Sequence, residues 1–176
     1  MRRPPGAQNC EEYVKKIKEA YSARDIKLFE RIAREAKRRC GGDIVDVLAA
    51  ETALPDVAYR VARYVITEIV NSRGQKTEHV YGLWKIQAVL VMGCATAKAL
   101  IESTLRAADE AGWPWQRWIL VAPLVEAVYR QCVEQTIDEV AEMLGDEWPA
   151  AESYIVDKVA EVELGGETIV ITSSWP

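Results

Sequence analysis

Hydrophobic residues recur at intervals of three and four along most of this chain, which is the spacing of amphipathic helices. The first apolar stripe covers residues 13–21, and the charged pair Arg24 and Asp25 interrupts it. Asp25 is a residue type that caps the N-terminus of a helix, so we predict a second helix after it, ending before Gly41 and Gly42. The first 40 residues therefore predict a helix-turn-helix, with one unbroken helix as the alternative.

Helical spacing continues through the middle of the chain. Residues 43–52 predict a short helix, and a second one follows Pro55 with an apolar face of Val57, Val61, Val65 and Ile69. A long helix is predicted over residues 77–111, because its uncharged middle suits a central position. The turn Gly112-Trp113-Pro114 then leads into a helix that reaches Leu144 and is kinked or restarted at Pro123.

The spacing of hydrophobic residues changes near the C-terminus. After a short helix from Ala150, apolar residues alternate with polar ones on both sides of Gly165-Gly166, at Val162, Leu164, Ile169 and Ile171. Alternation around a two-glycine turn is typical of a β-hairpin. We therefore predict an all-α fold class with a small C-terminal β-hairpin.

Three regions follow from these patterns: a basic N-terminal arm (1–42), a helical bundle body (43–147) and an acidic C-terminal helix and hairpin (148–176). The chain of 176 residues is 49% hydrophobic, so it can bury a core, and its 10 Gly and 7 Pro favour helices. The start does not resemble a secretory leader, and the longest uncharged stretch, residues 86–97, is shorter than the roughly 20 apolar residues that span a bilayer. We expect a soluble protein that is made and kept inside a cell.

Charge is divided along the chain. Residues 1–40 hold 12 of the 22 Lys and Arg and 6 of the 27 Asp and Glu, a net of +6, so the remainder carries 10 positive and 21 negative side chains, a net of −11. Lys158 is the only basic residue among the last 46. This asymmetry is typical of an arm that binds a polyanion, attached to a body that does not.

The basic residues of the arm include a helical series. Spacings of four, three and four residues place Lys27, Arg31, Arg34 and Arg38 along one helix face. The candidate nucleic-acid-binding residues are Arg2, Arg3, Lys15, Lys16, Lys18, Lys27, Arg31, Arg34, Lys37, Arg38 and Arg39. The alternative is an ordinary solvated helix face. If six to ten phosphates are contacted, affinity falls about 10³–10⁵-fold between 50 and 200 mM salt, with little sequence specificity.

The four cysteines lack the CxxC spacing of zinc sites, and their placement suggests disulfides instead. Cys10 and Cys40 are equally far from residue 25, and Cys94 and Cys132 are equally far from residue 113. Residues equidistant from the turn of an antiparallel helical hairpin lie beside each other. The alternative for Cys94 and Cys132 is that they are buried thiols. Disulfides inside cells are typical of hyperthermophiles.

Signals for catalysis are few. The single histidine, His79, excludes a multi-histidine metal site, and we expect neither a metal nor a cofactor. Arg73 and His79 are separated by five residues, which resembles the Arg-x4-6-His motif of HEPN-type ribonucleases. That resemblance implies that Arg73 steadies the phosphate of RNA and that His79 assists proton transfer. A helical ribonuclease is therefore the main alternative to a protein without enzymatic activity.

Three tryptophans cluster near one predicted turn, at Trp113, Trp115 and Trp118. We favour a packing role for them. The alternatives are a contact between subunits or a contact with an enclosing lipid layer.

The layout of a basic helical arm ahead of a helical body from Pro55 to Leu144 resembles the major capsid proteins of filamentous archaeal viruses, the rudivirus, lipothrixvirus and tristromavirus group. The resemblance lies in the basic residues of the arm and in the order of the regions, whereas the acidic tail and its hairpin depart from it. It implies a structural protein of the virion, assembled in the host cytoplasm. Its partners would be double-stranded DNA, held in A form through its phosphates, and a second copy or a paralogous capsid subunit, first as a dimer and then as a filament. A host helical adaptor that binds only protein, and stays in the cytoplasm, is the third alternative.

Overall fold

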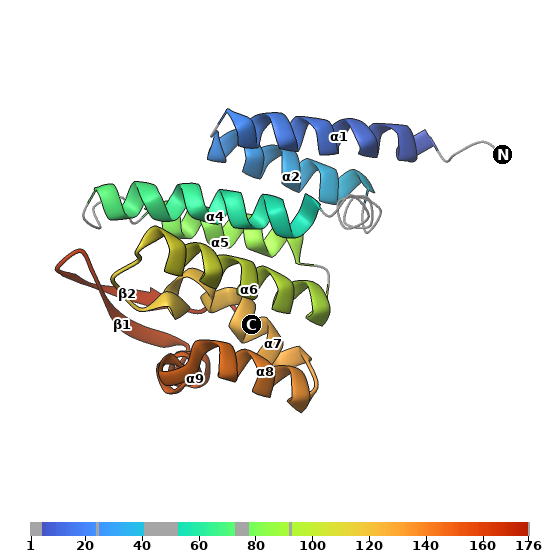
Figure 1. Cartoon of the computed structure of the whole chain (residues 1–176). Helices are drawn as coiled ribbons and strands as arrows, with labels where there is room; N and C mark the ends of the chain where they lie inside the picture. Colours follow the sequence, from blue (N-terminus) through green and yellow to red (C-terminus); the bar gives the residue numbers. More distant parts are fainter. Residues whose placement is uncertain (1–4, 24, 41–52, 73–77, 92, 176) are drawn as a thin grey trace.

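The protein folds as a stack of helices with a β-hairpin along one side (Figure 1). The computed structural model describes residues 5–23, 25–40, 53–72, 78–91 and 93–175. The helices are α1 (Pro5–Ser22), α2 (Ile26–Cys40), α4 (Ala53–Asn71), α5 (Glu78–Leu90), α6 (Cys94–Ala111), α7 (Ala122–Gln131), α8 (Glu134–Leu144) and α9 (Trp148–Asp157). The strands are β1 (Val159–Leu164) and β2 (Glu167–Thr172). The predicted fold class, all-α with a C-terminal hairpin, is confirmed, and the helix predicted at residues 43–52 lies outside the described residues.

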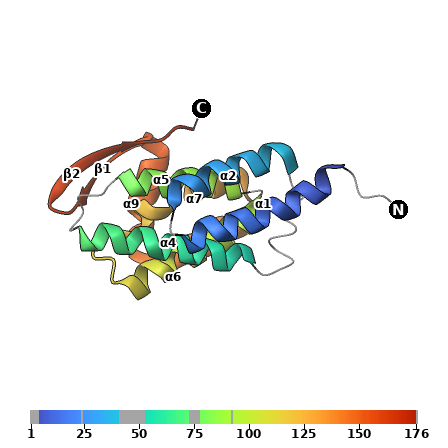
Figure 2. The same cartoon turned by 90° about the horizontal axis from the view of Figure 1, so that it is seen from above.

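The helices follow one another through the stack in approximate chain order. Figures 1 and 2 show α1 and α2 side by side at one end, α4 and α5 beneath them, and then α6 and α7, with α8 and α9 at the opposite end. One continuous core joins these layers, because Ile17 of α1, Ile66 of α4, Leu100 of α6 and Leu124 of α7 are all fully buried within it. The N-terminal helix pair thus packs on the body as its first layer.

The prediction of one long helix over residues 77–111 is wrong. Residue 90 ends α5, and α6 begins at Cys94 after Gly93, whose φ of 153° is a backbone conformation that residues with a side chain rarely adopt. The uncharged middle of the segment was consistent with burial, but it gave no information on whether the chain continues as one straight helix. The break allows α6 to pack along α4, which an unbroken helix would have carried away from it.

The helix predicted from Pro114 to Leu144 is also interrupted more often than expected. A 3₁₀ helix over Arg117–Val121 comes first, and α7 restarts with Pro123 in its first turn, as predicted. A second break, at Cys132, separates α7 from α8. The reason for the 3₁₀ segment lies in α5, since Trp84 Nε1 donates to the carbonyl of Ile119 at 2.7 Å and Gln87 Nε2 to that of Leu120 at 3.0 Å.

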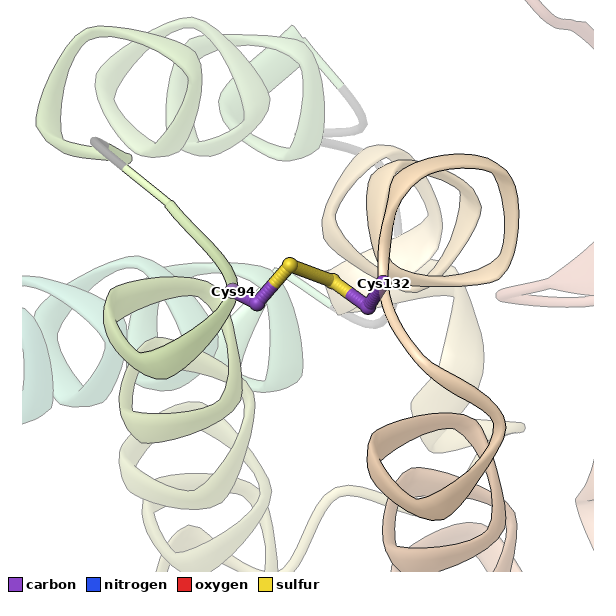
Figure 3. Close-up of a disulfide and its surroundings, with 2 residues drawn as sticks. All are labelled: Cys94 and Cys132. Carbon is purple, nitrogen blue, oxygen red and sulfur yellow. A yellow bond between two sulfur atoms is a disulfide. The ribbon is translucent and has the colours of Figure 1, made fainter.

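A disulfide joins the beginning of α6 to the end of α7 (Figure 3). The Cα atoms of Cys94 and Cys132 are 5.8 Å apart, which confirms the pairing predicted from their equal distance to the turn at residue 113. That turn is closed by Gly112, which caps α6 in the left-handed conformation. Cys40 is also disulfide-bonded, while the side chain of Cys10 lies outside the described residues, so the pairing of these two stays a prediction.

The C-terminal hairpin forms as predicted, with a two-residue turn at Gly165-Gly166 in which both φ angles are positive. Val162, Leu164 and Ile171 face the core, and the alternate positions face outward. A buried polar cluster fixes the end of β2 to the body. The carboxylate of Glu126, 3% exposed, accepts hydrogen bonds from Arg130 at 3.2 Å and from the hydroxyl of Ser173.

Tyr154 of α9 adjoins this cluster and supplies a pH-dependent contribution to stability. Burial, followed by the negative charge of Glu126, raises the pKa of Tyr154 from 10.0 to about 12. The folded state therefore retains a proton that the unfolded chain loses first, so the contribution is complete below pH 10 and is lost as the pH rises through about 12.

We expect the free energy of unfolding to fall by a few kcal/mol at most through this residue across that range, since one pKa unit is worth somewhat more than about 1 kcal/mol. Denaturant unfolding of the wild type and of Tyr154→Phe, measured at several alkaline pH values, isolates this part because all other titrating groups are common to both. The wild type should lose more stability than the variant. Parallel pH profiles would contradict the assignment.

Candidate nucleic-acid interface

Six of the eleven candidate basic residues lie on α2, and a local cap fixes the start of this helix. Asp25 caps it, with Oδ1 accepting a hydrogen bond from the backbone N–H of Leu28 at 3.0 Å. α1 ends at Ser22 and α2 begins at Ile26, which decides between one helix and two in favour of the helix-turn-helix. The cap therefore fixes where α2 begins and which of its side chains face inward.

The two faces of α2 differ sharply in chemistry. Ala36 is fully buried, and Leu28 and Ile32 pack against the core, so this face is the inner one. The opposite face is exposed and carries the four-residue series that the sequence singled out: Lys27, Arg31, Arg34 and Arg38. Together with Glu35, these residues line an open hollow of about 510 Å³.

Glu35 is the one carboxylate among the described residues that line the hollow, and it is already engaged. Its Oε1 atom accepts a hydrogen bond from the phenol of Tyr13 on α1 at 3.1 Å and lies 3.5 Å from the guanidinium of Arg39. Burial, and then the bond to Glu35, raise the pKa of the Tyr13 phenol above 10.0. These contacts hold the negative charge of Glu35 toward α1 and Arg39.

The hydrogen bond between Tyr13 and Glu35 was not predicted from the sequence, although the positions of the two residues indicated it. The two residues are equally far from residue 24, at the turn between α1 and α2, and the same symmetry had indicated the cysteine pairs. The contact matters for the site because it joins α1 to α2 directly behind the basic face.

The basic face has the dimensions of a contact with a phosphate backbone. From Lys27 to Arg38 the helix advances about 16 Å at 1.5 Å per residue. One strand of duplex DNA presents about five phosphates over that distance. Within the described part of the chain, no carboxylate lies within ion-pair distance of Lys27, Arg31 or Arg38. These cations are therefore available to an external anion.

The remaining candidates have different positions. Lys15 and Lys16 are exposed on α1, with the ammonium of Lys16 5.8 Å from the centre of the Tyr13 ring, and Arg39 is exposed at the end of α2. Outside the described part lie Arg2, Arg3 and the side chains of Lys18 and Lys37.

Negative charge gathers at the opposite end of the stack and along the hairpin at its side. Exposed carboxylates lie on α8, α9, the hairpin and the turns between them, at Glu134, Asp138, Glu142, Asp146, Asp157, Glu161, Glu163 and Glu167. Figure 1 shows α8 and α9 at the end of the molecule farthest from α1 and α2. The division of charge along the sequence has therefore become a division in space.

The structure describes only one of the two residues of the ribonuclease motif. His79 is half-buried in the first turn of α5, and Arg73 lies outside the described residues, so their approach stays a prediction. No group of three His, Cys, Asp or Glu side chains among the described residues is arranged to hold a metal ion.

The three clustered tryptophans have packing contacts. Trp113 and Trp118 are buried, and Trp115 is half-buried with its ring centre 4.9 Å from that of Trp113 in an edge-on contact. Among the described helices, none combines the length and apolar character needed to cross a bilayer.

The fold and the α2 face define a helical protein with a cationic end and an anionic end. Comparison with protein-family models, curated proteins and solved structures gave no match.

Proposed function

We propose that the protein is a structural nucleoprotein that coats double-stranded DNA, with the exposed face of α2 against the phosphate backbone. The observation that carries the proposal is the placement of four exposed cations on one face of α2, lining one hollow, at the end of the molecule opposite the acidic helices α8 and α9. The backbone that carries these cations is already ordered as a packed helix, so binding needs no backbone ordering there, and each phosphate contact releases condensed counterions. The carboxylates at the far end disfavour a second DNA contact there, which gives each subunit one orientation on the duplex.

The finer proposal is a viral capsid protein, and the resemblance in layout to the capsid proteins of filamentous archaeal viruses supports it. In this proposal many copies wrap one DNA molecule in a helical filament within the virion, the tightly packed basic faces exclude water, and the duplex takes the drier A form. The disulfide between Cys94 and Cys132 agrees with a host that grows at high temperature.

Nuclease protection tests the proposal against its alternatives. A coat protein should protect double-stranded DNA stoichiometrically, so that protection saturates at a fixed ratio of protein to base pairs and falls steeply with salt. The variant His79→Ala should protect DNA as well as the wild type. Turnover of RNA that is lost in His79→Ala would instead establish the ribonuclease. If no nucleic acid binds at any salt concentration, the proposal is wrong, and the result agrees with a protein-binding adaptor.

A further inference from the structure

The outer edge of the C-terminal hairpin has features that the DNA-binding proposal does not use. Among the described residues the sheet contains β1 and β2 alone, so within that part of the chain each strand has one edge without a strand partner. Unpaired edges are templates for pairing with another chain, and proteins usually protect them with charge or cover them. The two edges of this hairpin differ in how far charge and neighbouring elements protect them.

The β1 edge is protected. The strand packs beside α9, and its outward-facing positions carry Glu161 and Glu163. Two copies of β1 placed edge to edge would bring these carboxylates together, which destabilises the pairing.

The β2 edge is unprotected. Among the described elements, β1 is the only one with extensive backbone contacts to β2. From residue 168 to 172 the strand reads Thr-Ile-Val-Ile-Thr, which is uncharged, free of proline and made of β-branched residues. At its centre the aliphatic side chain of Val170 is 56% exposed.

The hydrogen-bonding groups at the centre of β2 point away from β1. Across an antiparallel pair, residues alternate between positions that bond to the partner strand and positions that do not. The N–H of Ser173 donates to the carbonyl of Lys158 at 2.9 Å, so Ser173 and the odd-numbered residues of β2 bond to β1. The N–H and C=O groups of Thr168, Val170 and Thr172 therefore face the open edge.

This edge is complementary to itself, because the segment reads the same in both directions. When a second copy of β2 is placed antiparallel about Val170, Val170 lies opposite its own counterpart. Thr168 then lies opposite Thr172 of the other copy, and Ile169 opposite Ile171. Each outward N–H meets an outward C=O, the isoleucines of both copies share the inner face, and Glu167 lies opposite Ser173 rather than another carboxylate.

We propose that β2 is a self-association surface and that its partner is a second copy of this chain, joined through a two-fold axis at Val170. The two hairpins form one continuous four-stranded antiparallel sheet, with both helical bodies on the same side of it. A single closed contact of this kind gives a dimer and uses up the exposed edge, which would otherwise recruit further chains. The proposal does not depend on DNA binding, because α2 and β2 lie on different parts of the molecule (Figure 2).

Analytical ultracentrifugation of the full chain, without nucleic acid, tests the proposal. We expect a species of twice the 19.7 kDa chain mass for the wild type. The variants Val170→Lys and Val170→Glu should each lose it, because each places two like charges opposite each other at the two-fold axis. Val159→Lys is the matched control, since Val159 is 44% exposed on the same outward side of the sheet but belongs to β1, and it should remain dimeric.

Mixing the two charged variants is the decisive step. Only a pairing that places position 170 opposite itself predicts that Val170→Lys and Val170→Glu, each monomeric alone, form a one-to-one heterodimer together. Heterodimer formation also shows that neither variant has simply failed to fold. A wild type that stays monomeric at every concentration, a wild-type dimer that survives Val170→Lys, or a mixture that stays monomeric would each overturn the proposal.

Discussion

The double variant Arg31→Glu with Arg38→Glu is expected to lose most of its affinity for double-stranded DNA while remaining folded. Both guanidinium groups lie on the exposed face of α2, away from the buried Ala36, so the core is not disturbed. Arg34 is left in place because it has an interaction within the chain. Each reversal removes one cation from the phosphate contact and adds an anion in its place.

The salt dependence of binding gives this prediction a quantitative form. Removing two phosphate contacts should make the slope of log affinity against log salt shallower by about 1.8, at about 0.9 per contact. Affinity at low salt should fall at least about tenfold. Fluorescence anisotropy with a labelled duplex measures both quantities.

A matched control separates the position of the charges from their number. Arg106→Glu with Lys158→Glu changes the net charge by the same amount, but Arg106 lies exposed on α6 and Lys158 lies after α9. Equal losses in the two double variants would show that only net charge matters, and the role of the α2 face would then be wrong.

The largest expected effect on stability comes from the disulfide between α6 and α7. Its two cysteines are 38 residues apart, and in the chain-entropy model a cross-link that closes a loop of this size stabilises the fold by about 4 kcal/mol. We expect Cys94→Ala with Cys132→Ala to lower the free energy of unfolding by about that amount. Guanidinium unfolding under non-reducing conditions is the measurement.

Reductant provides the control for this prediction. Cys40 is disulfide-bonded as well, so reduction changes more than one bond in the wild type. Measured in reductant, however, the wild type and the double alanine variant lack the same cross-links and should differ little. A variant that is just as destabilised relative to the reduced wild type would show that side-chain packing, rather than the cross-link, stabilises this region.

The accuracy of sequence prediction for this fold followed the strength of local signals. The N-cap at Asp25, the αL cap at Gly112 and the glycine turn of the hairpin each have a backbone requirement that few residue types satisfy, and all three were found. The ends of α5 and α7 were missed. The first break had one local signal, Gly93 with its φ of 153°, and the second coincides with the disulfide at Cys132, which is a tertiary contact.

In the candidate site, too, features with a local signal were predicted from the sequence and contacts between distant residues were not. Helical spacing was enough to predict that Lys27, Arg31, Arg34 and Arg38 share a face, because that depends only on the geometry of one helix. It was not enough to predict the hydrogen bond from Tyr13 to Glu35, since that contact requires the antiparallel placement of α1, whereas the pair of Glu35 and Arg39 follows the four-residue spacing within α2. The bond from Arg130 to Glu126 has the four-residue spacing of a helical ion pair, whereas the bond from Ser173 had no sequence signal, because Glu126 and Ser173 are 47 residues apart.

Electron microscopy of the protein assembled on double-stranded DNA tests the central claim most directly. The account predicts filaments in which the exposed face of α2 lies against the sugar-phosphate backbone, with Arg31 and Arg38 beside phosphates and the acidic α8–α9 end turned away from the duplex. A reconstruction in which these arginines face bulk solvent, or dock on the acidic end of a neighbouring copy with no DNA beside them, would contradict it.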